Sequence, residues 1–327
     1  MTHDVIGIGN AIVDVISHAD DQFLDNMGIE KGIMQLVEKD RAELLYAAMN
    51  DRAQAAGGSV ANTIAGIGHL GLGTAFLGKV KDDALGRFYV NDMTANGGAF
   101  PNPPSGDVAA PTSRSMIFVS PDGERSMNTY LGAGADFDAD DVPRDVFAGA
   151  KLVFLEGYLF DKDEGKSAFR RAAQLMHEAG GETAITLSDP FCVNRHRADF
   201  QHLIENEMDL VIGNEAEWTT LYECDLEDAL IRAAKVCKTV VCTRSGDPVV
   251  VRQGDIRIAA PVERVVPVDA TGAGDQFAAG FLYGYVTCTD LETAARMGVT
   301  CAAEVIGHVG PRPQADMQAR FRALGLM

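Results

Sequence analysis

The chain has 327 residues, of which 28 are Lys or Arg and 47 are Asp or Glu, so its formal net charge at pH 7 is −19. This acidic balance argues against the basic surface that non-specific binding to nucleic acid or to an anionic membrane requires. The apolar share of 46% and the charged share of 23% are those of a globular protein with a substantial core, not of a disordered chain.

The first residues lack the basic and apolar regions of a signal peptide, and no apolar run approaches the roughly 20 residues that a membrane helix needs. The six cysteines stand at irregular spacings without a C-x-x-C pair, which is typical of reduced thiols and not of a disulfide framework. We therefore expect a soluble, cytoplasmic protein.

Short β-branched apolar runs alternate with amphipathic stretches, a pattern typical of βαβ units and of a mostly parallel sheet. In chain order, strands are expected at Val5–Gly9, Thr74–Val80, Leu152–Glu156, Thr183–Ser188, Leu210–Gly213, Thr239–Thr243, Val249–Arg252 and Ile256–Ala259. Helices are expected at Ser59–Leu70, Asp83–Asn96, Asp163–Ala179, Ala216–Tyr222, Leu226–Cys237, Gly274–Val286 and Asp290–Val305. The predicted fold class is therefore α/β.

Two stretches interrupt this alternation. Residues 15–37 and 100–131 are strand-like without a long helix, and the second ends in a predicted hairpin around Pro121-Asp122-Gly123. We expect both stretches to form one small β-sheet that covers the site as a lid, although two unrelated surface excursions would give the same pattern. The remaining residues, 1–14, 38–99 and 132–327, would form a large α/β domain.

The most informative segment is Asp269–Asp275, where a strand-like run leads through a Gly-rich turn into a helix. The small residues Gly272, Ala273 and Gly274 allow successive backbone N–H groups to converge on an anion at the helix N-terminus. Asp275 lies in the first turn, where its carboxylate could take a proton from a hydroxyl while the N–H groups stabilise the developing charge. An ordinary helix cap would explain Asp275 but not the three small residues.

A second Gly-rich segment, Gly57-Gly58, precedes a helix that has Ser59 as a suitable N-cap and Asn62 in its first turn. An Asn side chain offers both a donor and an acceptor to sugar hydroxyls, although an ordinary helix start fits the segment equally well. After the first strand, Asn10 and Asp14 are expected to face a ligand at the carboxyl edge of the sheet.

Two motifs are near misses. A dinucleotide-binding fingerprint at Gly7–Asp14 fails because Ile12 stands where the third glycine belongs, which disfavours a Rossmann oxidoreductase. A P-loop at Gly73–Val80 fails because Val80 replaces the hydroxyl residue that would hold magnesium.

Asn214 and Glu217 follow a predicted strand and lie near one helix start. Such oxygen ligands could organise hydrated Mg²⁺ around nucleotide phosphates, but acidic residues also occur at helix N-termini because they favour the dipole. Arg125, in the predicted hairpin, is a candidate cation for a transferred phosphate, although a lone Arg is usually a surface charge.

From Val5 to about Arg312, the chain resembles the ribokinase-like, or PfkB, family of carbohydrate and nucleoside kinases. Asp269–Asp275 is similar to the family's D-T-x-G-A-G-D signature, with Ala270 in place of the usual Thr. Gly57–Asn62 resembles its N-terminal signature, and Asn214–Glu217 resembles its N-x-x-E. The resemblance implies a three-layer αβα sandwich with a central, mostly parallel sheet and a small β-sheet lid.

The resemblance also implies a role for each candidate residue. Asp275 would be the general base, with Gly272, Ala273 and Gly274 as the anion hole and Arg125 as a further catalytic residue. The acceptor would be held by Asn10, Asp14, Gly57, Gly58 and Asn62, and ATP by Asn214, Thr243, Gly246 and Gly310. Mg²⁺ would be held mainly through water by Asn214 and Glu217, and Asp269 would lie near a monovalent cation such as K⁺. This division of labour suffices because positioning and electrostatics dominate phosphoryl transfer.

Gly9-Asn10-x-x-x-Asp14 is more similar to adenosine kinases than to ribokinases. Four further matches resemble adenosine kinases: Leu187–Phe191, Asn214–Glu217, Phe23–Asp25 followed by Gln35–Glu38, and Glu124–Ser126. We therefore expect a kinase that phosphorylates the 5′-type hydroxyl of a nucleoside, adenosine to AMP, with a sugar kinase of the ribokinase or fructokinase type as the alternative. A non-catalytic ligand-binding protein on this fold is disfavoured because Asp275 is present. The expected partners are ATP and a small nucleoside or sugar, and the protein would be a monomer or a homodimer.

Overall fold

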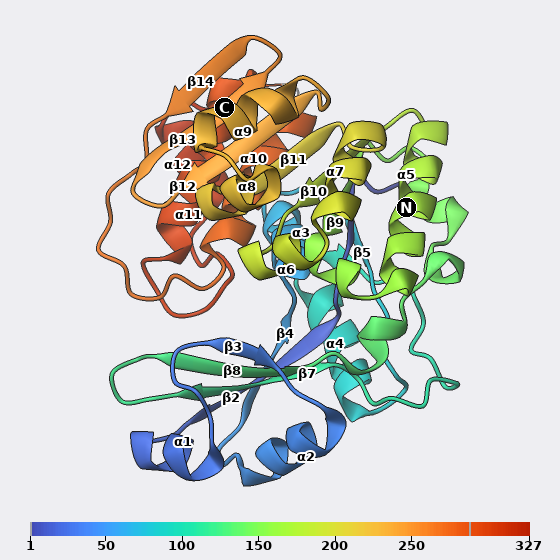
Figure 1. The fold of residues 1–327 in the computed structure, drawn as a ribbon, viewed down its shortest axis with the longest axis vertical. Helices are drawn as coiled ribbons and strands as arrows, with labels where there is room; N and C mark the ends of the chain where they lie inside the picture. Colours follow the sequence, from blue (N-terminus) through green and yellow to red (C-terminus); the bar gives the residue numbers. More distant parts are fainter. Residues whose placement is uncertain (1, 288) are drawn as a thin grey trace.

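The computed structural model describes residues 2–287 and 289–327, and over these residues it contains a nine-stranded and a five-stranded sheet (Figure 1). In spatial order, the large sheet consists of β14 (Ile256–Ala260), β13 (Asp247–Gln253), β12 (Thr239–Arg244), β11 (Leu210–Asn214), β10 (Glu182–Thr186), β9 (Leu152–Glu156), β1 (Val5–Ile8), β5 (Thr74–Leu77) and β6 (Gly98–Ala99). Neighbouring strands from β12 to β6 are parallel, whereas β12, β13 and β14 pair antiparallel.

Helices cover both faces of the large sheet, which is why its central strands are continuous apolar runs and not alternating ones. One face packs on α3 (Ser59–His69), α4 (Ala84–Ala95), α10 (Ala273–Val286) and α11 (Leu291–Val305). The other packs on α5 (Asp163–Glu178), α6 (Pro190–Arg195), α7 (Arg197–Asn206), α8 (Glu215–Tyr222) and α9 (Leu226–Ala234). In β1, Val5 contributes to the first core, and Ile6 and Ile8 contribute to the second. The expected three-layer α/β/α sandwich is confirmed.

The shorter elements connect these layers. A C-terminal helix, α12 (Met317–Ala323), packs in a small third cluster with Tyr283 and Met297. The described residues also contain four 3₁₀ helices: η1 (Gly132–Asp136), η2 (Ala139–Asp141), η3 (Arg144–Phe147) and η4 (Gly157–Asp161). Among the residues that the structure covers, none of the helices is long and apolar enough to span a bilayer.

The small sheet has the order β3 (Met34–Leu36), β8 (Arg125–Tyr130), β7 (Arg114–Val119), β2 (Ile12–His18) and β4 (Ala53–Gly57). Figure 1 shows α1 (Asp21–Met27) and α2 (Lys39–Ala48) on the side that faces away from the large sheet. These helices pack on the side chains of Val13, Val15, Met116 and Phe118. The opposite face of the small sheet is therefore turned toward the large sheet.

The small sheet is built from more of the chain than the predicted stretches 15–37 and 100–131. It begins at Ile12, and its fifth strand, β4, lies within the segment 38–99 that was assigned to the large domain. The sequence Ala-Gln-Ala-Ala-Gly of β4 has no β-branched or aromatic residue, so no local signal marks it as a strand. Pairing with β2, for example between Asp14 and Ala55, makes it one.

Candidate active site

The turn before α10 requires a glycine at Gly272. Gly272 has φ +79°, and a Cβ atom there would lie 2.6 Å from the Cα of Pro311, so only glycine fits. Gly274 lines the cavity described below. The amide of Ala273 was expected to bind an anion, but it donates to the carbonyl oxygen of Ala270 at 3.2 Å and is not free to do so in this structure.

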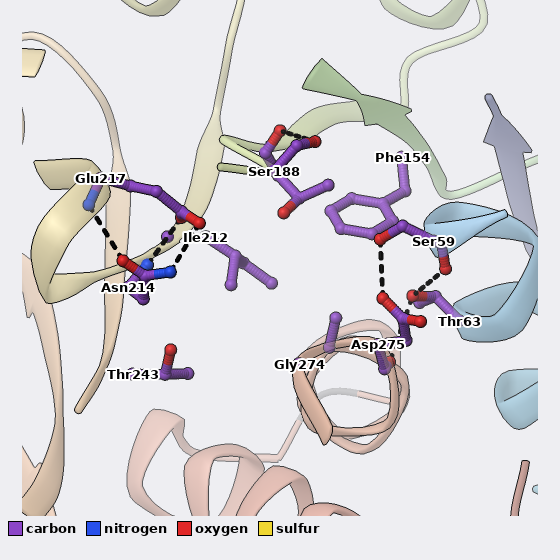
Figure 2. Close-up of a pocket in the computed structure, with 13 residues that line it drawn as sticks. Ser59, Thr63, Phe154, Ser188, Ile212, Asn214, Glu217, Thr243, Gly274 and Asp275 are labelled. Atoms are coloured by element: carbon purple, nitrogen blue, oxygen red, sulfur yellow. Dashed lines mark hydrogen bonds between the residues drawn. The ribbon is translucent and has the colours of Figure 1, made fainter. Parts of the chain in front are cut away.

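The carboxylate of Asp275, in the first turn of α10, is held by side chains of α3 (Figure 2). Ser59 Oγ donates to Oδ1 at 2.6 Å, and Asn62 Nδ2 donates to Oδ2 at 3.0 Å. The hydroxyl of Thr63 donates to the backbone carbonyl of Asp275 at 3.1 Å. The N-cap of α3 is Gly58, not Ser59 as expected, and this leaves the Ser59 hydroxyl free to bind the carboxylate.

Burial raises the pKa of Asp275 to about 6, while the hydrogen bonds from Ser59 and Asn62 act in the opposite direction. The carboxylate is therefore ionised at neutral pH but more basic than an exposed Asp, as a general base should be. Asn62 Oδ1 is buried and has no hydrogen-bond partner among the described residues, so it is an acceptor open to a ligand hydroxyl.

The predicted acceptor residues come together where β1, β2 and β4 meet. A Cβ atom on Gly57 would lie 2.5 Å from Asp14 Oδ2, and one on Gly58 would lie 2.3 Å from the carbonyl oxygen of Asn10. The two glycines are thus needed for this close approach. Asn10 follows β1 at the carboxyl edge of the large sheet as expected, but Asp14 lies in β2 of the small sheet, because the chain crosses between the sheets after Asn10. Burial raises the pKa of Asp14 to about 7.

Glu156, at the end of β9, is a site residue that the sequence analysis missed. Its side chain is buried and accepts from Asn10 N at 3.2 Å, from Asn10 Nδ2 at 2.9 Å and from Val60 N at 3.0 Å. Burial raises the pKa of Glu156 to about 7. The backbone and side-chain N–H groups of Asn10 thus donate to Glu156, which leaves the side-chain oxygen of Asn10 for a ligand. The sequence signal that could have identified Glu156 as a site residue is its place as the one acidic residue at the end of the otherwise apolar strand β9.

A cavity of about 150 Å³ joins Asp275 to the predicted nucleotide residues. Figure 2 shows Ser59, Thr63, Gly274 and Asp275 on one side and Asn214, Glu217 and Thr243 on the other. Thr186 and Ser188 also line it, and Ser188 has the positive φ of +74° that is uncommon outside glycine. Neither of these two was singled out as a candidate site residue.

Asn214 and Glu217 form a reciprocal cap at the start of α8. Glu217 N donates to Asn214 Oδ1 at 2.9 Å, and Asn214 N donates to Glu217 Oε2 at 2.7 Å. Burial raises the pKa of Glu217 to about 7. Within residues 2–287 and 289–327, no group of three or more His, Cys, Asp or Glu side chains is arranged to hold a metal ion. Asn214 Nδ2 also donates to Glu217 Oε1 at 2.6 Å, so both carboxylate oxygens of Glu217 already accept from Asn214. Because Mg²⁺ keeps several waters when it binds with phosphates, this pair could contact it through water.

Asp269 forms an ion pair with Arg125 of the small sheet. Arg125 Nη1, from β8, lies 2.9 Å from Asp269 Oδ2 and 2.9 Å from Thr271 Oγ1. The same carboxylate accepts from Thr271 N at 2.9 Å and from Gly310 N at 3.1 Å. These hydrogen bonds and Arg125 hold the pKa of Asp269 below its usual value against the effect of burial. A monovalent cation does not fit Asp269 in this arrangement, because Arg125 already supplies the positive charge.

The structure places the remaining predicted residues at different distances from this centre. Gly310, which has φ +106°, lies beside Asp269 because its backbone N–H donates to the Asp269 carboxylate. Thr243, near the end of β12, lines the cavity. Gly246 lies in the turn between β12 and β13 and does not line the cavity.

Comparisons with known proteins show the family to which the chain belongs. The family model described as pfkB family carbohydrate kinase matches residues 32–317. The structure of a probable sugar kinase from Rhizobium etli CFN 42 is 44% identical, with a TM-score of 0.91 and coverage of 100% of both chains. The structure of adenosine kinase from Sinorhizobium meliloti is 45% identical, with a TM-score of 0.90, and covers 99% of this chain and 100% of that one. Adenosine kinase from Saccharomyces cerevisiae is 26% identical over 95% of this chain and 97% of its own length.

Proposed function

Because this chain belongs to the pfkB family of carbohydrate kinases, we propose that it transfers the γ-phosphoryl group of ATP to the primary hydroxyl of a nucleoside, with adenosine as the acceptor. The observation that carries the proposal is Asp275. Its carboxylate is held at 2.6 Å by Ser59 and at 3.0 Å by Asn62, and it shares a cavity with Gly274, Asn214 and Glu217. The proposed base, the proposed anion-binding turn and the proposed oxygen ligands for a metal–nucleotide thus line one cavity.

In the proposed reaction, Asp275 accepts the proton of the acceptor hydroxyl as the hydroxyl oxygen bonds to the γ-phosphorus. The bond between that phosphorus and the β,γ-bridging oxygen of ATP breaks, and ADP leaves. Backbone N–H groups of the turn at Gly272 and Gly274 stabilise the charge on the phosphoryl oxygens. The acceptor is oriented by Asn10, Asp14, Gly57, Gly58 and Asn62.

The nucleotide side is proposed to use Asn214, Thr243, Gly246 and Gly310 for ATP. Glu217 and Asn214 would hold Mg²⁺ through water, and the ion would supply charge neutralisation to the nucleotide phosphates. Arg125 Nε is buried without a partner in the part of the chain that the structure describes, so it is a donor available to a phosphate oxygen while Nη1 remains on Asp269.

An apolar surface beside Asp14 supports a nucleoside as the acceptor. On the face of the small sheet that is turned toward the large sheet, Met34, Met127, Ile117 and Ile16 stand in one row across β3, β8, β7 and β2. Leu36 lies in the next row, which ends at Asp14. Met34 is 41% and Leu36 50% exposed, so this end of the face is uncovered. A purine base has apolar faces to bury there, whereas a free sugar does not.

A sugar kinase is the second candidate, because a probable sugar kinase and an adenosine kinase match this chain at nearly equal identity, 44% and 45%. An ATP-dependent phosphorylation assay with adenosine, other nucleosides, ribose and fructose separates the two. We expect turnover of adenosine. Turnover of ribose or fructose with none of adenosine would reverse the choice of acceptor.

The assignment of Asp275 is tested by Asp275→Asn and Asp275→Ala. Removing the base is expected to lower kcat by about 10²- to 10⁴-fold, while ATP binding measured by calorimetry is retained. Near-normal turnover by either variant would show that Asp275 is not the base.

A further inference from the structure

Three consecutive residues after α11, Gly310, Pro311 and Arg312, touch both substrate sides of the proposed site. Gly310 N donates to Asp269 Oδ2 at 3.1 Å. The carbonyl oxygen of Pro311 accepts from Gln276 Nε2 at 2.9 Å, and the atoms of Pro311 fill the space where a side chain on Gly272 would lie. The segment is therefore fixed to the Gly-rich turn and to the first turn of α10.

Arg312 extends from this segment to the acceptor side. Its Nη2 donates to the carbonyl oxygen of Ala56 at 2.6 Å, and its Nη1 lies 3.0 Å from Asp92 Oδ2 of α4. Ala56 N in turn donates to the same Asp92 oxygen at 3.3 Å. Both polar groups of Ala56 in β4 are thus held by one ion pair, whose side chains are only 19% and 27% exposed.

Ala56 immediately precedes the two glycines that make room for Asp14 and Asn10. The charge of Arg312 also acts on the acceptor side, since it opposes the effect of burial on the pKa of Asp14. Gln276 strengthens the connection from the other direction, because its Nε2 donates to Pro311 O and also to Asn62 O at 3.1 Å. One short segment therefore contacts the turn that would bind phosphate, the helix of the base and the strand that shapes the acceptor pocket.

We propose that Arg312 is a positioning residue that couples the two substrates. Nucleotide bound at the Gly-rich turn stabilises the contacts of Gly310–Arg312 with that turn, and Arg312 then holds β4 in the conformation that admits the acceptor. The proposal rests on the proposed kinase function. Because such coupling is reciprocal, bound acceptor strengthens nucleotide binding by the same factor, and allosteric couplings commonly amount to about 5- to 150-fold.

The test uses the full chain and amide hydrogen exchange, which needs no knowledge of the acceptor. AMP-PNP with Mg²⁺ is expected to slow exchange of the segment 53–60 about fivefold or more in the wild type. In Arg312→Ala this slowing is expected to disappear, while AMP-PNP still binds within threefold of wild type. Arg197→Ala is the matched control, because Arg197 also joins a backbone carbonyl, that of Thr220, to a carboxylate, that of Glu223, and none of these three residues lines the cavity.

Kinetics supply a readout that a purely structural role would not move. Arg312→Ala is expected to raise the KM for the acceptor at saturating ATP and the KM for ATP at saturating acceptor by about the same factor, roughly tenfold, while the Kd of AMP-PNP without acceptor changes less than threefold. Arg312→Lys is expected to restore part of the loss. Asp92→Asn keeps Arg312 but weakens its ion pair, so its KM values are expected to lie between those of wild type and Arg312→Ala. If Arg312→Ala does not fold, Asp92→Asn and Arg312→Lys provide the test instead.

Equal protection of residues 53–60 in wild type and Arg312→Ala, or no protection in the wild type despite bound AMP-PNP, would overturn the coupling. Failure of AMP-PNP to bind the wild type would instead overturn the proposed kinase function and the coupling with it.

Discussion

Replacing Ser59 with alanine tests how the environment of Asp275 sets its basicity. The Ser59 hydroxyl donates to Asp275 Oδ1 at 2.6 Å and opposes the effect of burial, which raises the pKa of Asp275 to about 6. Without this donor the ionised form is less stable, so the pKa rises further. A hydrogen bond to a charged group contributes about 1.5–3 kcal/mol, and about 1.4 kcal/mol corresponds to one pH unit. The acid limb of the pH profile should therefore move up by about 1 to 2 pH units.

The assay is kcat/KM for the acceptor between pH 5 and 9 at saturating ATP, because this profile reports the free enzyme's base. In the wild type the rate should fall as the pH drops through about 6, where Asp275 takes up a proton. Ser59→Ala should lose activity at a higher pH and approach the wild type at pH 9. Thr63→Val is the matched control, since the Thr63 hydroxyl binds the backbone carbonyl of Asp275 at 3.1 Å and not its carboxylate. An acid limb that stays in place or moves down in Ser59→Ala would refute the reasoning.

Three further outcomes are expected. Gly272→Ala places a Cβ atom 2.6 Å from Pro311 at φ +79°, so thermal unfolding should show that the free energy of unfolding falls by about 1–3 kcal/mol. Gly274→Ala is the control that should keep the wild-type Tm, because nothing lies within 4 Å of a Cβ atom there. Arg125→Gln removes the cation from Asp269, so kcat should fall and activity in KCl should exceed that in tetramethylammonium chloride; equal activity in both salts would contradict this. Burial raises the pKa of Glu156 to about 7, so the folded protein loses stability as the pH rises from the unfolded-state pKa of this residue through 7. Urea unfolding should therefore show Glu156→Gln to be more stable than wild type by up to about 3 kcal/mol at pH 8 and equally stable near pH 4.

The features that the sequence predicted well are local ones. The Gly-rich turn and the helix that carries Asp275 are adjacent in sequence, so turn chemistry and hydrophobic pattern identify them together. The strand-like run expected directly before the turn is not a strand, since β14 ends at Ala260 and the chain from there to the turn is irregular. The alternating apolar runs likewise predicted the central parallel strands and their helices. In these places local propensity and tertiary structure agree.

The features that the sequence did not predict depend on contacts between distant residues. Glu156 becomes a site residue through hydrogen bonds to Asn10, 146 positions away, and to Val60. Arg312 reaches Ala56 across 256 positions. The strand β4 exists because β2 lies beside it, whatever its own weak propensity. Pattern and spacing carry no information about such partners.

The order of strands in the two sheets has a consequence for how the protein folds during synthesis. β1 is synthesised long before β9, yet it lies between β5 and β9, and Val5 pairs with Leu152. β2 likewise pairs in parallel with β7, whose first residue is Arg114. These contacts are distant in sequence, which slows folding and leaves strand edges exposed until their partners are made. The cluster of Asn10, Val60 and Glu156 can form only after β9 has been synthesised, and the turn at Gly272 is added much later.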